Sequence, residues 1–182
     1  MKTVMISIKP KWTEKIASGE KTIEVRKTAP QEVPFKCYIY ETKGQYVKFT
    51  HGAHTKYEYG RGKVIGEFIC DKVYSIKNRS SSFSVADEEQ GVTNEIARQS
   101  CLYYDDMVSY FGNKDGFGWH ISNLTLYDKP KELSEFCIPC KVSCENCKNP
   151  LYFECWCEEK GKKIVTRPPL SWCYVEDLGE EE

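Results

Sequence analysis

Short segments rich in β-branched and aromatic residues recur along the chain without a regular alternation of strand and helix. Such a composition is typical of β-strands, and turn-forming residues separate the segments. The strands that this pattern predicts run over Val4–Ile8, Lys21–Lys27, Pro34–Thr42, Lys63–Ile76, Gly116–Tyr127 and Ser171–Val175. Because no regular βα repeat links them, we expect an α+β fold: a small, mostly antiparallel β-barrel with short peripheral helices.

Three short helices are predicted between these strands. In the first, Trp12 and Ile16 lie four residues apart and share an apolar face. Gly19 follows it, where a left-handed C-terminal cap is expected. The second and third are expected over Thr93–Cys101 and Asp105–Phe111, each starting at a residue type that caps helix N-termini.

The chain of 182 residues is long enough for one domain, 1–182. Residues 129–167 interrupt the strand series and are predicted to form a cysteine-rich insertion, and residues 168–178 are predicted to contain the closing strand. No long apolar segment and no signal peptide are evident, so we expect a cytoplasmic protein that does not engage a membrane.

Charge is distributed unevenly along the sequence. Met1–Lys63 holds 13 basic against 6 acidic residues, whereas the remainder holds 13 against 21. This asymmetry indicates a local site for an anionic ligand. Lysines that simply solvate the surface are an equally good explanation.

The segment after the first helix alternates apolar and charged residues. Ile23 and Val25 point to one face, which should be the core, while Glu24 and Arg26 point to the other and Lys21 stands at the strand entrance. Lysine and arginine can hold a phosphate or a carbonyl oxygen, and the glutamate can accept a hydrogen bond from an exocyclic amine or act as an acid or base. The alternative is a structural ion pair between Glu24 and Arg26.

This segment resembles the signature of the ASCH family, a branch of the PUA-like β-barrels. The family pattern Gly-X-Lys-X-X-Glu-X-Arg is matched at every fixed position, by Gly19, Lys21, Glu24 and Arg26. Further similarity covers Ile6–Pro10, Lys63–Phe68 and Gly118–Ile121. The resemblance implies a PUA-like fold and a role in binding RNA or in RNA-linked processes.

Some small ASCH proteins hydrolyse N4-acetylcytidine, and ribonuclease activity is described for others. In the amidohydrolases a lysine, a threonine and a distant glutamate carry the chemistry. Lys21 matches the lysine, but Glu24 stands at the threonine position, which argues against the same covalent mechanism. Glu67 is a candidate for the distant glutamate.

We therefore predict an RNA- or nucleoside-binding protein, with a possible regulatory role. The predicted ligand-binding residues are Lys9, Lys21, Glu24, Arg26 and His120. A structural role for His120 is the alternative at that position. The alternative function is a hydrolase in the same cleft, acting on a modified nucleoside or RNA, with Lys21 and Glu24 as catalytic residues.

Six of the ten cysteines gather in the predicted insertion. Two C-x2-C pairs in a reducing compartment are typical of a structural Zn²⁺ site with four thiolates, although their spacer is short. The predicted ligands are Cys137, Cys140, Cys144 and Cys147, with Cys155 and Cys157 as alternates. A redox-labile loop is the alternative, and the insertion could also dock a protein partner. The four lone cysteines are expected in the core: Cys37, Cys70 and Cys173 lie in strand patterns, and Cys101 lies near a helix end.

Overall fold

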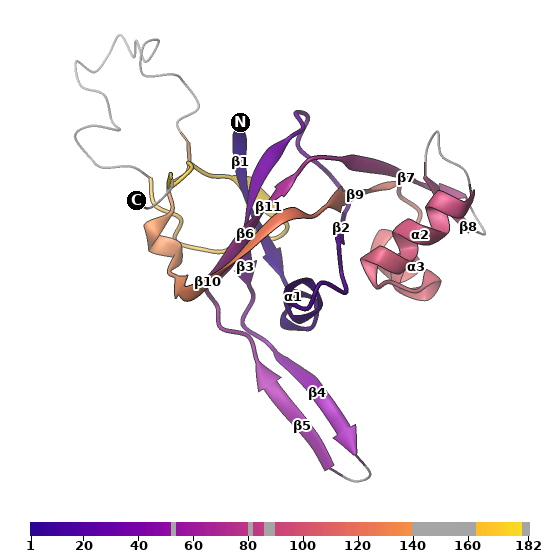
Figure 1. Cartoon of the computed structure of the whole chain (residues 1–182), viewed down its shortest axis with the longest axis horizontal. Helices are drawn as coiled ribbons and strands as arrows, with labels where there is room; N and C mark the ends of the chain where they lie inside the picture. Colours follow the sequence, from indigo (N-terminus) through magenta and orange to yellow (C-terminus); the bar gives the residue numbers. More distant parts are fainter. Residues whose placement is uncertain (52–53, 80–81, 86–89, 140–162, 180–182) are drawn as a thin grey trace.

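The computed structural model describes residues 1–51, 54–79, 82–85, 90–139 and 163–179 (Figure 1). Its elements are, in chain order, β1 (Lys2–Ile8), α1 (Pro10–Ala17), β2 (Ile23–Arg26), β3 (Phe35–Glu41), β4 (Gln45–His51), β5 (His54–Tyr59), β6 (Val64–Cys70), β7 (Val73–Arg79), β8 (Ser82–Val85), α2 (Gln90–Ser100), α3 (Tyr104–Phe111), β9 (Gly116–His120), β10 (Ser122–Lys131), the 3₁₀ helix η1 (Leu133–Glu135) and β11 (Trp172–Tyr174). Most strand pairs are antiparallel, and β1 with β3 is parallel. The α+β prediction is confirmed.

The structure contains two larger sheets, and two segments of the chain each run through both of them as a paired ribbon. The five-stranded sheet has the order β10-β6-β3-β1-β11, and the four-stranded sheet has the order β2-β9-β7-β8. The segment predicted as one strand over Lys63–Ile76 divides into β6 and β7, which belong to different sheets. The segment over Gly116–Tyr127 divides likewise into β9 and β10. Because β6 pairs with β10 and β7 with β9, the ribbon leaves one sheet and enters the other.

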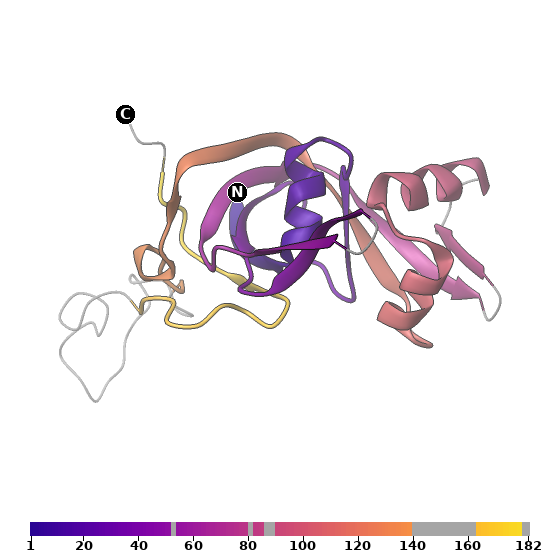
Figure 2. The same cartoon turned by 90° about the horizontal axis from the view of Figure 1, so that it is seen from below.

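The closed barrel that we expected is not formed by the described strands. The five-stranded sheet ends at β10 and β11, and the four-stranded sheet ends at β2 and β8, without pairing between these edges. The strands nevertheless curve around the region that holds α1 (Figure 2). Local alternation predicts strands, whereas closure depends on pairings between edges that are distant in sequence.

Three apolar clusters hold the layers together. The first lies between the two sheets and α1, and includes Ile6, Phe68 and Trp119. The second lies between the four-stranded sheet and the helices α2 and α3, and includes Phe111. The third covers the other face of the five-stranded sheet, where Phe136 and the C-terminal segment pack on it. Every residue of β3 is buried, because that sheet is covered on both faces.

The helices differ from the prediction mainly at their starts. Helix α2 begins at Gln90, so Thr93 lies within it, and the N-cap of α3 is Tyr103 rather than Asp105. Gly19 follows α1 with φ +77°, as the predicted left-handed cap requires. No helix in the described ranges is both long and apolar enough to cross a lipid bilayer.

The hairpin β4–β5 projects from the body of the molecule (Figure 1). Strand β10 continues to Lys131, beyond the predicted start of the insertion. Further along, Ile138 N donates to Lys163 O at 2.8 Å, and Cys137 forms a β-bridge with Ile164. The two ends of the segment 140–162 are therefore held side by side.

Candidate functional site

The alternation of β2 is confirmed, and its apolar residues lie in a core cluster as expected. Ile23 and Val25 pack in the cluster beneath α2 and α3, not between the sheets. Glu24 pairs across the ladder with Trp119, whose side chain lies in the cluster between the two sheets. Directly paired residues of antiparallel strands project from the same face. The charged residues therefore point into the space between the sheets.

Lys21 is 2% exposed, and its ammonium joins β2 to the helical layer. Its Nζ donates to Ile23 O at 2.8 Å and to Ser100 O at 2.7 Å. Ser100 is the last residue of α2, where helix carbonyls lack partners and attract a cation. Thr22 N also donates to Gln99 O at 3.0 Å, so the end of α2 is fixed against the strand entrance.

Glu24 and Arg26 form a buried pair with unused polar atoms. Arg26 Nη1 lies 2.8 Å from Glu24 Oε1, and Arg26 Nη2 donates to Ser7 O at 2.6 Å. Glu24 Oε2 lies 3.3 Å from Lys21 Nζ but, like Arg26 Nε, receives or makes no hydrogen bond within the described residues. Glu24 Oε2 is therefore held by the ion pair with Lys21, and Arg26 Nε is a buried donor without a hydrogen bond in the described part of the chain.

A cavity of about 260 Å³ adjoins this cluster, and we call it the inner cavity. It brings together residues of β2, α1, α3 and the α2–α3 connection. Its lining residues are Trp12, Lys21, Glu24, Val25, Arg26, Leu102, Asp106, Ser109 and Tyr110. One wall is therefore charged and buried, while Trp12 and Tyr110 contribute half-buried aromatic rings.

Three residues predicted for the site do not line the inner cavity. Lys9 is exposed at the N-terminus of α1. His120 Nδ1 lies 2.6 Å from Asp71 Oδ1, an exposed contact that matches the structural alternative for this histidine. Glu67 forms an ion pair with Lys36 at 3.0 Å and accepts a hydrogen bond from the Tyr127 hydroxyl.

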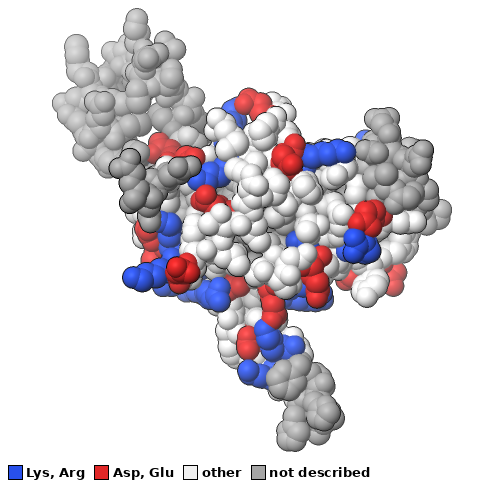
Figure 3. Space-filling view, viewed as in Figure 1, with Lys and Arg blue, Asp and Glu red and all other residues white. Residues whose placement is uncertain are grey.

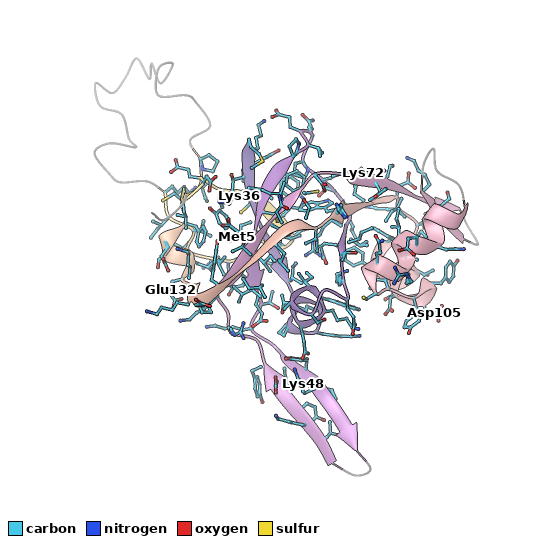
Figure 4. All side chains as sticks on the ribbon, viewed as in Figure 1. Met5, Lys36, Lys48, Lys72, Asp105 and Glu132 are labelled. Carbon is cyan, nitrogen blue, oxygen red and sulfur yellow. The ribbon has the colours of Figure 1, made fainter. Side chains whose placement is uncertain are left out.

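Lys36 and its partners form a separate polar cluster beneath the C-terminal segment. Lys36 Nζ and the Tyr38 hydroxyl contact Asp177 Oδ1 at 3.0 and 2.6 Å. Burial and the hydrogen bond to Asp177 raise the pKa of Tyr38 to about 12. Figure 4 shows Lys36 on the opposite side of the molecule from Asp105 in the helical layer. This cluster anchors the end of the chain and is not part of the inner cavity.

Basic residues of the first third are in part neutralised by acidic residues from elsewhere in the chain. Besides Lys36, Lys63 pairs with Glu132 at 2.7 Å. On the face seen in Figure 3, acidic and basic side chains are interspersed over the described residues. The uneven charge along the sequence therefore does not become one basic patch on that face.

The structure places two of the four lone cysteines in the core, as predicted, whereas Cys101 and Cys173 are only half-buried. Cys37 and Cys70 are both fully buried, and burial raises the pKa of the Cys70 thiol to about 12. Of the predicted zinc ligands, Cys137 is described and half-buried at the base of the insertion. The others, Cys140, Cys144, Cys147, Cys155 and Cys157, lie outside the described residues. Within the described ranges no group of three or more His, Cys, Asp or Glu side chains could hold a metal.

Sequence reasoning identified the charged wall of the inner cavity but missed the remaining walls. Leu102, Asp106, Ser109 and Tyr110 come from a region about 80 residues away and carry no motif. Trp12 was expected only on an apolar helix face. No sequence pattern links these residues; the fold brings them together, because it places α3 and the α2–α3 connection over β2.

Together, the fold and site define a class: a two-sheet α+β domain with a buried Lys-Glu-Arg cluster at a small cavity. Comparison with solved structures identifies this fold in the ASCH protein of Zymomonas mobilis, with a TM-score of 0.55 and 16% identity over 96% of this chain and 88% of that one. Two single-substitution variants of the Zymomonas protein match similarly, tyrosine to phenylalanine (TM-score 0.52, 15% identity, 97% and 91% covered) and serine to alanine (0.55, 16%, 96% and 89%).

No family model and no curated protein matches the sequence. The structural similarity confirms the ASCH-like fold that the signature implied. At this identity it shows the fold alone.

Proposed function

We propose that this chain binds RNA or nucleosides and that the inner cavity receives a base. The observation that carries the proposal is the wall of the inner cavity, where Glu24 supplies a carboxylate and Arg26 a guanidinium beside Trp12 and Tyr110. A hydrogen bond to a charged group contributes about 1.5–3 kcal/mol. A ligand that offers one donor to Glu24 and one acceptor to Arg26 would therefore gain affinity in this cavity.

The edge of an amino-bearing base offers that combination. The exocyclic amine of cytosine or adenine donates, and the adjacent ring nitrogen accepts. Glu24 accepts from the amine, and Arg26 donates to the ring nitrogen. Uracil has the opposite pattern at the corresponding positions, so this site should disfavour it. Trp12 and Tyr110 offer aromatic surfaces to the flat ring.

Lys21 fits this proposal as a positioning residue. Two of its N–H donors are engaged by the carbonyls of Ile23 and Ser100. Its Nζ also lies 3.3 Å from Glu24 Oε2, so three groups of the protein surround the amine and hold it in place. Its contacts therefore favour binding over the hydrolase alternative, in which Lys21 and Glu24 would act on N4-acetylcytidine or RNA.

The test is calorimetric titration with cytidine, adenosine and uridine, and with short single-stranded RNA. We expect cytidine or adenosine to bind at least fivefold more tightly than uridine, since one good bidentate pair discriminates by about 1–3 kcal/mol. Arg26→Ala should abolish this preference. RNA affinity should fall with rising salt concentration.

Because substitutions in the buried cluster could unfold the chain, Trp12→Leu provides a second variant on a half-buried side chain. It should weaken nucleoside binding, whereas Tyr57→Leu on the exposed hairpin should not. The proposal is wrong if the folded wild-type protein binds neither nucleosides nor RNA. Deacetylated product from N4-acetylcytidine, lost in Lys21→Ala, would instead support the hydrolase.

We also propose that the cysteine-rich segment holds a structural Zn²⁺. The pairing of Cys137 with Ile164 supports this proposal, because it holds Cys137 beside the residues that follow the other five cysteines in the sequence. Four thiolates from two C-x2-C pairs are a ligand set that Zn²⁺ prefers. The metal would crosslink the segment, and the segment could then present a surface to a protein partner.

A further inference from the structure

A second and larger hollow adjoins the inner cavity, and we call it the outer hollow. Its volume is about 700 Å³, and Trp12, Leu102 and Asp106 line both spaces. Its other lining residues are Lys11, Lys15, Ala97, Arg98, Cys101, Tyr103 and Tyr104. Sites for drug-sized ligands span about 300–1,000 Å³. The inner cavity thus suits a single ring system, and the outer hollow has room for a further nucleotide.

The outer hollow presents unusually exposed aromatic side chains. Tyr103 is 83% exposed and Tyr104 is 47% exposed, although both are large and partly apolar. Tyr103 stands at the N-terminus of α3, where Asp106 accepts from its backbone N–H, so its ring is carried by a fixed backbone. Exposed rings beside a base-sized cavity are what single-stranded nucleic acids stack on.

The charged residues of the outer hollow suit a single phosphate group rather than a highly charged anion. Lys15 pairs with Glu20, and Arg98 pairs with Glu95 at 2.5 Å. Lys11 lies 4.5 Å from the centroid of the Trp12 ring, and no described carboxylate forms an ion pair with it. One available cation next to three aromatic rings matches the alternation of base and phosphate along a strand.

We infer that the outer hollow is a subsite for the nucleotide next to the bound base. The ligand is then a single-stranded polynucleotide, one base of which enters the inner cavity while its neighbour stacks on Tyr103. This inference rests on the proposed function, because it requires a base in the inner cavity. It narrows the ligand class, since a free nucleoside would leave the outer hollow unused.

The test compares cytidine with CMP, with a cytidine-containing hexamer of single-stranded RNA, and with DNA of the same sequence. Stacking on an aromatic side chain strengthens binding by roughly 5- to 150-fold per base. We expect the RNA hexamer to bind at least tenfold more tightly than cytidine. Tyr103→Ala should remove most of that gain and leave the affinity for cytidine unchanged, because Tyr103 does not line the inner cavity.

Lys11→Gln should reduce the salt dependence of hexamer binding by about one phosphate contact. Tyr59→Ala is the matched control, because Tyr59 is 71% exposed on the hairpin and lines neither space. If cytidine binds but the hexamer binds no more tightly, or if Tyr103→Ala leaves hexamer affinity unchanged, the inference is wrong while the proposed function stands. If no nucleoside or strand binds, both are wrong. Equal affinity for RNA and DNA would show that base and phosphate, not the 2′-hydroxyl, are recognised.

Discussion

Replacing Glu24 by glutamine tests whether this carboxylate is the buried counter-charge of two cations. Glu24 is 3% exposed and lies 2.8 Å from Arg26 Nη1 and 3.3 Å from Lys21 Nζ. Glutamine preserves the size and the acceptor oxygen but removes the negative charge. Glu24→Gln therefore leaves two buried cations with no carboxylate between them, and it should lower the free energy of unfolding.

The magnitude follows from the burial of the cluster. Removing one member of a buried ion pair costs about 3–5 kcal/mol, because the remaining charge stays desolvated. For a chain of this length, each kcal/mol shifts Tm by about 2–4 °C. Glu24→Gln should thus lower Tm by roughly 6–20 °C.

The assay is urea unfolding followed by circular dichroism, with a thermal scan of the same samples. The matched control is Glu20→Gln, because Glu20 is four residues away and pairs with Lys15 while 60% exposed. An exposed pair of this kind contributes less than about 1 kcal/mol. Equal losses in the two variants, or a loss below about 1 kcal/mol in Glu24→Gln, would refute the buried counter-charge.

The remaining predictions concern the C-terminal segment and the metal. Burial alone would raise the pKa of Asp177, but hydrogen bonds from Tyr38 and Lys36 outweigh it and hold that pKa below its ordinary 3.8. The stabilisation by Asp177 is therefore complete above pH 3.8 and is lost as the pH falls through the folded-state pKa of Asp177. Hydrogen exchange of residues 172–179 should accelerate in that pH range. Asp177→Asn should remove this pH dependence. Protein purified without added zinc should contain about one Zn²⁺ per chain by mass spectrometry, and Cys140→Ser should lower it whereas Cys101→Ser should not; a metal-free wild-type protein would contradict the site.

The sequence predicted the elements of this fold better than their arrangement. Alternating β-branched residues located β1 and β3 within two residues of their observed ends, because period-two burial is a local property. Which side of β2 faces the space between the sheets is not local. Ile23 and Val25 are apolar wherever the core lies, and only the packing of α2 and α3 decides that it lies beneath them. The charged wall of the cavity was predictable because its residues lie in one short motif. Its aromatic and helical walls were not, because only the packing of distant elements brings them to the cavity.

The structure separates the roles of the signature residues. Gly19 ends α1 with a positive φ, which turns the chain into β2. Lys21 donates hydrogen bonds to the carbonyl oxygens of Ile23 and Ser100, and so links the start of β2 to the end of α2. Glu24 and Arg26 pair with each other at the wall of the inner cavity, where their carboxylate and guanidinium face a ligand site.

This division links the signature to the rest of the cavity. The α2–α3 connection starts immediately after Ser100 and supplies Leu102 to both the inner cavity and the outer hollow. Because Lys21 fixes the end of α2, it also fixes the wall that closes over Glu24 and Arg26. Loss of the lysine should therefore disturb the shape of the site, while loss of the arginine should change what the site recognises. The eight-residue motif thus positions this wall through the hydrogen bond from Lys21 to Ser100, which lies 79 residues further along the chain.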